Sequence, residues 1–488
     1  MTMQEPIQAG ASGSVGLRQR VLQAGGWVTA GFLLDKLIAA GQMMIVARLL
    51  TPADFGLMAA SAAVLLAATT LAELGIEPAL VARREIRPGD LRVAWTLALG
   101  RSVVLAAVLW VLAEPIAAFF RFPELVMLLR VHTLALLIQG AQSPAVALLL
   151  RNLDMGRRVR LDLVRRLVEA AATIALAWWL RSAWALLGGQ LIGFAVSSVL
   201  SFHMAPFMPR LSLDRESLGY FARYGKHLNV TTIMIFCVTG AGEFVVGRML
   251  GASALGIYQI ALTIPVLIST RPVVVISQVS FPAYAILQRG QGGTGRAFAL
   301  QFALMGLILV PVATGLALLA PDVVRLLFGA KWLEAAQPLR VLSLYAVCAG
   351  LSGVMGSLHY GMNRPEIQTR IWAVQFVVYA GGIVPLTAWY GVVGAAAALT
   401  LSFGLGFLLQ AFYTLQLLGS EARVAFAALG RTTLPVIAIG VGLTVLAKLP
   451  AEPSGAWPVL AGLAAGTAYV LYLWRIEYPR LVGLWRGE

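Results

Sequence analysis

Long apolar stretches follow one another along almost the whole chain, separated by short polar connections. Each stretch holds about 20 residues, and a helix of that length crosses a hydrocarbon core of roughly 30 Å. The pattern predicts about 14 membrane-spanning helices and leaves one longer polar segment, near residues 203–222. The predicted helices are centred near residues 36, 65, 102, 136, 172, 194, 235, 268, 308, 347, 377, 403, 439 and 465.

Composition supports this interpretation. The 488 residues are 59% hydrophobic and 12% charged, with a mean hydropathy of +0.82. A soluble fold of this length could not cover so much apolar surface. The fold class we expect is therefore an all-α polytopic membrane protein. Two cysteines are too few for a disulfide framework, and we expect both to be buried thiols.

The net charge is +15, and the positive residues are concentrated in every second connection between the predicted helices. The N-terminus, the even-numbered connections and the tail hold 25 of the 37 lysines and arginines, whereas the odd-numbered connections hold nine. Positive charge stays on the cytoplasmic side of a membrane, so both termini are expected in the cytoplasm. The alternation explains the basic character without nucleic acid as a partner. Residues 1–17 are polar, so we expect the first helix to remain as an anchor rather than be cleaved as a signal.

One short signature occurs twice, as Ala47–Leu57 and Gly247–Ile257. Arg, Leu and Gly recur at matching places, and each copy lies between two apolar stretches. We expect Pro52 to begin a helix, and Gly56 and Gly256 to allow close packing. A second pair of matching segments, Leu129–Val131 and Leu339–Val341, follows in the same order.

The repeats predict two pseudo-symmetric halves of six helices each, followed by two further C-terminal helices. Two related halves that move about a central site are the architecture of many transporters. The expected divisions are residues 16–206, 207–420 and 421–488.

Four stretches resemble bacterial polysaccharide-biosynthesis flippases of the multidrug/oligosaccharidyl-lipid/polysaccharide exporter superfamily. They are Ala47–Gly56, Trp184–Gly193, Phe281–Tyr284 and Gly361–Pro365. The resemblance implies alternating-access transport of undecaprenyl-pyrophosphate-linked oligosaccharide repeat units across the bacterial cytoplasmic (inner) membrane, for exopolysaccharide or lipopolysaccharide synthesis. It implies as partners the lipid-linked oligosaccharide, membrane lipids, a polysaccharide polymerase and chain-length or export proteins.

A pyrophosphate cargo requires cations, and ionisable groups deep in a membrane helix are expected to face a cavity or a partner. The predicted anion site consists of Lys36, Arg101, Lys226 and Arg271. For Lys226, which lies near a helix end, extension of the side chain to lipid headgroups is the alternative.

Three carboxylates lie in or beside the predicted helices, Asp35, Glu73 and Glu243. They are candidates for ion coupling or for lining the cavity, and Glu73 and Glu243 are alternatively structural partners of the arginines. Asp35 and Lys36 point about 100° apart on a helix and need not pair. His132 is expected to make a hydrogen bond between helices. Sugar recognition would fall to scattered polar groups, Gln42, Gln139, Gln142, Gln259 and Gln375.

The sequence gives less support to other functional classes, such as nucleotide-driven transporters and enzymes. The sequence has no phosphate-binding Gly-x-x-x-x-Gly-Lys-Ser/Thr loop, so the energy source stays open between an ion gradient and passive export. No paired carboxylates, cysteine–histidine cluster or nucleophile–base spacing indicates catalysis, a metal or a cofactor. The alternatives are an ion-coupled multidrug exporter of the same superfamily and, more remotely, a membrane polysaccharide polymerase or ligase.

Overall fold

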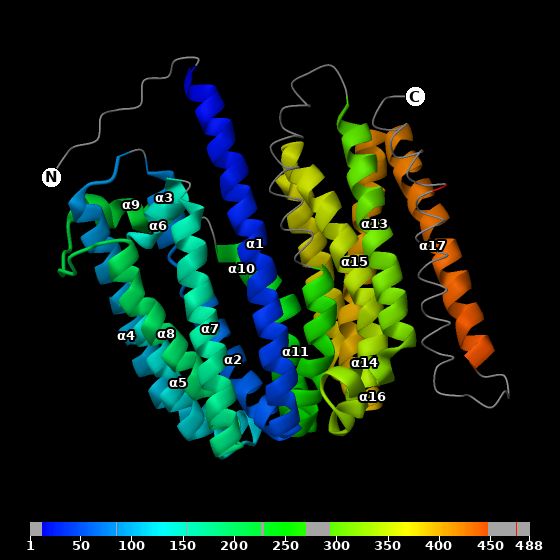
Figure 1. Ribbon diagram of the computed structural model, residues 1–488, viewed down its shortest axis with the longest axis horizontal. Coiled ribbons are helices and arrows are strands. Elements are labelled where there is room, and N and C mark those ends of the chain that lie inside the picture. Colours follow the sequence, from blue (N-terminus) through cyan, green and yellow to red (C-terminus); the bar gives the residue numbers. More distant parts are fainter. Residues whose placement is uncertain are drawn as a thin grey trace. The chain divides into compact units, whose positions relative to one another are not determined.

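The computed structural model describes residues 12–83, 85–152, 154–225, 229–269, 293–447 and 475 (Figure 1). Every regular element in these ranges is a helix, and eight helices there are long and apolar enough to cross a membrane. This confirms the all-α polytopic fold. The predicted centres up to residue 439 all fall inside described helices, whereas residue 465 lies outside the described residues. The count of 14 spans is not confirmed.

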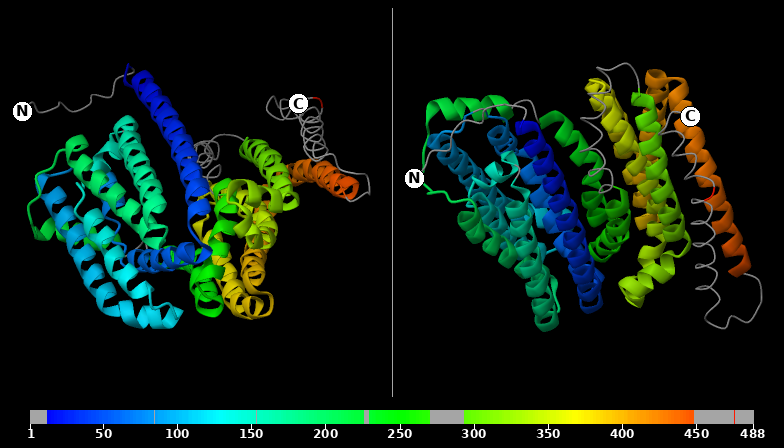
Figure 2. Two further views of the ribbon diagram at one scale, coloured as in Figure 1. Left: turned by 60° about the horizontal axis from the view of Figure 1, so that its bottom comes forward. Right: turned by 45° about the horizontal axis from the view of Figure 1, so that its top comes forward.

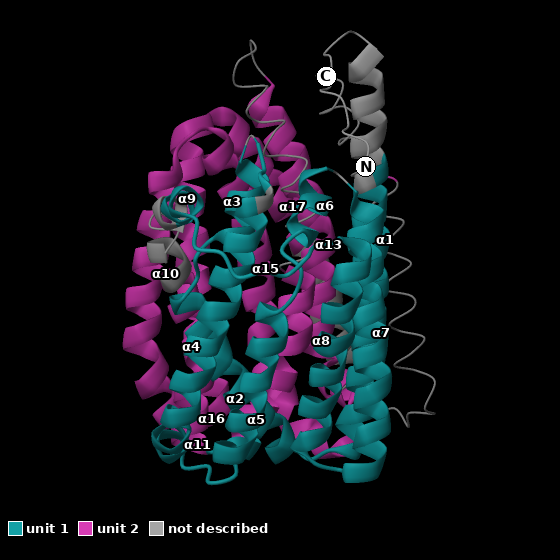
Figure 3. Ribbon diagram, turned by 90° about the vertical axis from the view of Figure 1, so that its left-hand side faces the viewer, with its two compact units in different colours: residues 1–233, 251–253 teal, residues 234–250, 254–488 magenta. Residues whose placement is uncertain are grey.

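The chain forms two compact units, which Figure 3 shows in different colours. Unit 1 holds residues 1–233 and 251–253, and unit 2 holds residues 234–250 and 254–488. The predicted divisions 16–206, 207–420 and 421–488 stay predictions.

Unit 1 contains long helices and several short ones. They are α1 (Ser12–Leu49), α2 (Pro52–Leu71), α3 (Ile76–Ala82), α4 (Pro88–Phe120), α5 (Leu125–Gly140), α6 (Val146–Arg151), α7 (Met155–Leu180), α8 (Ala183–Met204) and α9 (Arg215–Gly225). In unit 1, α7 packs against α1 and α8, and α5 packs against α4 and α8. Figure 1 shows α3, α6 and α9 together at one end of this unit.

The first copy of the repeated signature contains the N-terminal cap of α2. Thr51 and Asp54 form a capping box at the start of α2, and Pro52 is the first helical residue, as predicted. The Asp54 carboxylate also accepts a hydrogen bond of 3.0 Å from the backbone N–H of Ala183, which starts α8. A Cβ at Gly56 would overlap the carbonyl of Ala252 in the same unit, so the predicted close packing at Gly56 is confirmed. The packing role of Gly256 stays a prediction.

A buried polar contact joins two helices of unit 1. His132 on α5 is 1% exposed, and its Nδ1 lies 2.7 Å from the hydroxyl of Ser61 on α2. The predicted hydrogen bond between helices is therefore confirmed. Close approach of α4 and α5 depends on Gly140, where a Cβ would overlap Ser102.

The short helix α9 is clamped to the ends of α3 and α4 (Figure 2). The Asp214 carboxylate caps it by accepting hydrogen bonds from the backbone N–H and the hydroxyl of Ser217, which lower the pKa of Asp214 below its ordinary value. The Ser217 hydroxyl also lies 2.7 Å from Asp90, which is 0% exposed and 3.0 Å from the Arg83 guanidinium. The polar connection thus folds back onto its own unit.

Unit 2 continues from α10 (Asn229–Thr239), whose first residues belong to unit 1. It includes α11 (Ala241–Leu250), the helix Ala252–Ser269 from residue 254 on, α13 (Thr294–Leu318), α14 (Ala320–Leu327), η1 (Ala330–Ala335), α15 (Ala336–Gly361), α16 (Pro365–Leu418) and α17 (Ser420–Ala447). Side chains of α13, α15 and α17 share a core that includes Phe302, Met305, Leu351 and Ala425. Helix α15, which contributes to this core, also lines a cavity in unit 2.

Helix α16 contains two helical segments joined at Gly391. The backbone there has φ 58° and ψ −136°, a conformation in which a side chain is strained. The two segments match the two spans predicted near residues 377 and 403. The connection between them is a tight turn rather than a loop.

Candidate functional site

A cavity of about 450 Å³ lies inside unit 1, among apolar helices. Its charged lining consists of three arginines and three carboxylates, which come from α3, α4, α7 and the connection after α2. They are Arg101, Arg158, Arg165, Glu73, Glu77 and Asp162. Gln139, Gln142 and Ser197 add uncharged polar groups. The lining is therefore strongly polar, although its formal charges balance.

Arg101 on α4 is a predicted site residue that the structure places in the cavity. Its guanidinium lies 3.6 Å from the Glu73 carboxylate, so the predicted pairing of Glu73 with an arginine is confirmed. The pair is loose, because 3.6 Å exceeds the usual length of a charge-assisted hydrogen bond. Glu73 is 44% exposed on its side chain, and the buried Nε of Arg101 has no hydrogen-bond partner among the described residues. Arg101 therefore has donor capacity left for a ligand oxygen.

The second and third arginines come from α7, and each is paired with at least one acid. Arg158 Nη1 lies 3.1 Å from Glu77, and its Nε lies 3.6 Å from Asp162. Arg165 Nη1 donates to Glu169 at 2.7 Å. These pairs fix the guanidinium groups toward the cavity wall, which reduces the entropy that a bound anion would have to remove.

A chain of ion pairs leads from Arg165 to the first helix. Glu169 accepts from Arg165 and also from Arg166, at 3.0 Å. Arg166 lies 3.5 Å from Asp35, and Asp35 lies 2.7 Å from Lys36. The sequence left the pairing of Asp35 with Lys36 open, and the structure shows the pair, because the long lysine side chain reaches the neighbouring carboxylate. Lys36 is not among the residues that line the cavity, and this chain of ion pairs connects it to Arg165 in the cavity wall.

Sequence reasoning missed the contribution of α7. Its arginines cluster along the chain, and the alternation of positive charge counts them in an even-numbered, cytoplasmic connection. A signal was present, since Arg158, Asp162, Arg165 and Glu169 recur at spacings of three and four residues. Such spacing places alternating charges on a single face of a helix, which is typical of a polar face that needs partners.

The structure does not test the predicted site residues Lys226, Arg271 and Glu243 of the second half. Lys226 and Arg271 lie outside the described residues. Glu243 lies on α11 and is partly exposed, and it makes no ion pair with a residue that the structure describes. Its electrostatic neighbours are Tyr258 and Tyr379 in the same unit. The roles of these three ionisable residues stay predictions.

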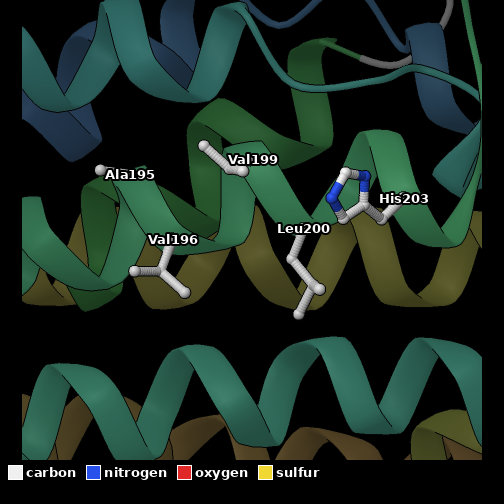
Figure 4. Close-up of a pocket in the computed structure, with 5 residues that line it drawn as sticks. All are labelled: Ala195, Val196, Val199, Leu200 and His203. Atoms are coloured by element: carbon white, nitrogen blue, oxygen red, sulfur yellow. The ribbon is translucent and has the colours of Figure 1, made fainter.

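A hollow of about 330 Å³ on α8 has another character (Figure 4). All its lining residues come from one helix, so it is a surface feature rather than an enclosed cavity. They are Ala195, Val196, Val199, Leu200 and His203. Val199 is 65% exposed, which suits contact with hydrocarbon rather than a polar ligand.

Apolar helices in two units, with a charged cavity inside one of them, define a polytopic helical membrane protein of the transporter type. The chain belongs to the polysaccharide biosynthesis protein family, whose profile matches residues 45–337. It is 24% identical over 395 residues to the lipopolysaccharide biosynthesis protein WzxC of Escherichia coli K12, covering 80% of this chain and 79% of that protein. It is also 24% identical over 300 residues to the succinoglycan biosynthesis transport protein ExoT of Rhizobium meliloti, covering 62% and 61%.

Among solved structures, the chain is similar to the lipid II flippase MurJ in an inward closed conformation. The TM-score is 0.77 at 12% identity, covering 93% of this chain and 99% of that one. At this identity the likeness concerns the fold. The relatives in sequence, which include a transport protein, favour transport over catalysis.

Proposed function

We infer that this protein is a flippase that moves undecaprenyl-pyrophosphate-linked oligosaccharide repeat units across the bacterial cytoplasmic membrane. The flippase would act by alternating access, and its cargo would serve exopolysaccharide or lipopolysaccharide synthesis. The observation that carries the proposal is the cavity in unit 1, where Arg101 lines the wall and its Nε has no hydrogen-bond partner among the described residues. Family membership and the names of the relatives support a role in polysaccharide biosynthesis.

The chemistry of the cavity suits a pyrophosphate. An arginine can bind phosphate oxygens through two parallel N–H groups, and the interaction is stronger in a partly buried site than in water. Because the charges balance, a bound anion has to displace a carboxylate. Glu73 is the carboxylate that an anion on Arg101 would displace, since the Arg101–Glu73 ion pair is 3.6 Å long and the Glu73 side chain is 44% exposed. In this proposal Glu73 and the phosphate compete for Arg101.

The competition also offers a coupling mechanism. Protonation of Glu73 would release Arg101 for the cargo, so Glu73 is the carboxylate that we propose for coupling to protons. Glu73→Gln should then retain cargo binding while transport in proteoliposomes loses its dependence on a proton gradient. A gradient dependence equal to that of the unmodified protein would remove Glu73 from this role.

The decisive test compares two arginine–glutamate pairs of unit 1. Arg101→Ala should abolish polymer export in cells and flipping in proteoliposomes, with unchanged insertion in the membrane. Arg130→Ala is the matched control, because Arg130 pairs with Glu114 at 2.8 Å and does not line the cavity. Normal export by Arg101→Ala would remove it from the site, and equal losses in both variants would indicate a structural effect. Arg271→Ala is expected to abolish export as well.

The membrane, the orientation of the termini and the protein partners are part of the same proposal. We place the protein in the inner membrane with both termini in the cytoplasm, because the positive charges alternate along the connections. A reporter fused after Glu488 should be active only in the cytoplasm. Partnership with a polysaccharide polymerase or with chain-length and export proteins follows from the function and is testable by cross-linking in cells.

The three carboxylates of the cavity give one specific reason to test a second function, export of cationic drugs. Glu73, Glu77 and Asp162 could face a cation if their arginine partners moved. Transfer assays with a cationic dye and with a lipid-linked oligosaccharide, in the same proteoliposomes, separate the two functions. The proposal requires transfer of the oligosaccharide and not of the dye.

A further inference from the structure

A second cavity, of about 920 Å³, lies within unit 2. Tyr360, Asn363 and Pro365 line it where α15 meets α16, and Tyr345 and Phe403 line it deeper in the helices. The stretch of α15 between Tyr345 and Tyr360 rises about 22 Å. The cavity therefore extends from one helix end well into the depth of the membrane. The neighbouring Arg364 precedes α16 and Arg370 lies in its first turns, at a helix end that the charge pattern predicts to be cytoplasmic.

The lining of this cavity is uncharged among the described residues, in contrast to that of unit 1. Its polar groups are amides and hydroxyls, which both donate and accept hydrogen bonds. The amides are Asn363, Gln368, Gln375 and Gln410. An uncharged lining gives a dianionic pyrophosphate no counter-charge, so this pocket and the arginine-lined cavity suit different chemical groups.

A buried hydrogen-bond network holds two of the amides in fixed positions. His359 is 0% exposed; its Nε2 lies 3.1 Å from the hydroxyl of Thr414, and its Nδ1 lies 2.9 Å from Gln368 Nε2. Gln368 Nε2 also donates to Gln410 Oε1 at 3.3 Å. Gln375 is held separately. Its side-chain Nε2 donates to the backbone carbonyl of Ser402 at 3.5 Å, and its own backbone carbonyl accepts a hydrogen bond of 2.9 Å from the Ser402 hydroxyl. The polar wall is thus preorganised, which lowers the entropic cost of binding.

One polar group in the wall lacks a partner. Ser352 is 5% exposed and lines the cavity, and its hydroxyl makes no hydrogen bond with a residue that the structure describes. A buried hydroxyl without a partner is destabilising, so such groups in native structures call for a ligand or a water molecule. This hydroxyl indicates an occupant that can form hydrogen bonds.

Three aromatic side chains line the same cavity as one cluster. Phe403 packs edge to face with Tyr345 at 4.8 Å between ring centroids and with Trp372 at 6.0 Å. The faces of aromatic rings carry negative partial charge and attract the weakly positive C–H groups of a ligand. Rings beside fixed amides therefore suit a ligand that has both C–H faces and hydroxyl groups.

We propose that this pocket binds uncharged sugar residues of the lipid-linked oligosaccharide. The proposal rests on the proposed function and assigns part of its cargo to unit 2. A sugar ring supplies hydroxyls for Ser352 and the amides and a C–H face for the aromatic cluster. A hydrocarbon tail supplies no hydrogen bonds and would leave the same buried groups unpaired. The volume lies within the range of roughly 300–1,000 Å³ that is typical of small-molecule sites.

The test uses two tryptophans on α16. Trp372→Ala removes a ring from the pocket, whereas Trp389→Ala removes a ring that is 74% exposed and does not line the cavity. Flipping is measured in proteoliposomes with two fluorescent undecaprenyl-pyrophosphate carriers, one bearing a single sugar and the other a neutral tetrasaccharide. Ser352→Ala is a second, milder variant.

We expect Trp372→Ala to slow transfer of the tetrasaccharide carrier about tenfold and that of the single-sugar carrier less than twofold. Ser352→Ala should shift the ratio in the same direction, and Trp389→Ala should leave it unchanged. An unchanged ratio in both pocket variants would overturn the proposal. Undecaprenyl phosphate has no sugar, and its binding gives a further control. If Trp372→Ala weakens that binding and Trp389→Ala does not, the pocket belongs to the lipid tail instead.

Failure of the proposed function is distinguishable from failure of the pocket. If the unmodified protein transfers neither carrier, the flippase proposal fails. Calorimetry with the free tetrasaccharide and the detergent-solubilised protein then tests the pocket directly. Binding that is lost in Trp372→Ala and kept in Trp389→Ala supports the sugar site, and absence of binding to the unmodified protein refutes it.

Discussion

Replacing Asp90 by alanine should detach α9 from the end of unit 1. The Asp90 carboxylate is 0% exposed and compensates Arg83, whose side chain is 13% exposed. It also accepts hydrogen bonds of 2.8 Å from the backbone N–H of Arg87 and 2.7 Å from the Ser217 hydroxyl. Arg83 in turn lies over the ring of Tyr220 on α9, 4.7 Å from its centroid. One carboxylate thus connects α3, α4 and α9.

The expected cost follows from burial. Removing one partner of a buried ion pair costs about 3–5 kcal/mol, because the remaining charge stays in a poorly solvated site. Arg83 Nη1 makes no aligned hydrogen bond with a described residue, so its compensation by Asp90 is electrostatic. The exposed pair Arg87–Glu216 joins the same elements at 2.9 Å, with side chains 62% and 67% exposed. Such pairs contribute at most about 1 kcal/mol, so Glu216→Ala is a matched control.

The assay combines unfolding of the detergent-solubilised protein in SDS with hydrogen exchange of residues 215–225. Asp90→Ala should lower the free energy of unfolding by about 3–5 kcal/mol and remove the protection of α9, whereas Glu216→Ala should change little. A double-mutant cycle of Asp90 and Arg83 should give a coupling energy of about 1–3 kcal/mol. Equal effects of Asp90→Ala and Glu216→Ala would refute the reasoning from burial.

Two glycine positions give further predictions. Gly56→Leu should destabilise the protein by about 1–3 kcal/mol, because the leucine side chain would overlap the backbone of Ala252. Gly41→Leu, at a site with open space, is the control and should be nearly neutral. Thermal unfolding in detergent compares the two variants, and equal melting temperatures would contradict the close approach at Gly56. Gly391→Ala should cost about 1–3 kcal/mol, because a Cβ strains the backbone at φ 58°, and Gly404→Ala in the same helix serves as the control. A loss at Gly404 equal to that at Gly391 would indicate a helix-propensity effect instead.

The sequence by itself determined the membrane setting, the helical fold and the start of α2. Stretches of about 20 apolar residues have one stable solution in a bilayer, because a helix satisfies its own backbone hydrogen bonds. The capping residues Thr51, Pro52 and Asp54 act within one turn, so they too are readable locally. Arg101 and Glu73 were recognised because an ionised group in an apolar helix is costly without a partner.

Only the tertiary structure decided which charges share a cavity. Arg158 and Arg165 resemble any basic flank of a membrane helix until α7 is placed beside the acids of α3 and of its own face. The pairing of Arg158 with Glu77, like that of Asp54 with Ala183, joins residues far apart in the chain. Local patterns carry no information on such contacts, because they depend on how helices pack. The same holds for the uncharged pocket of unit 2, whose wall is assembled from separate helices.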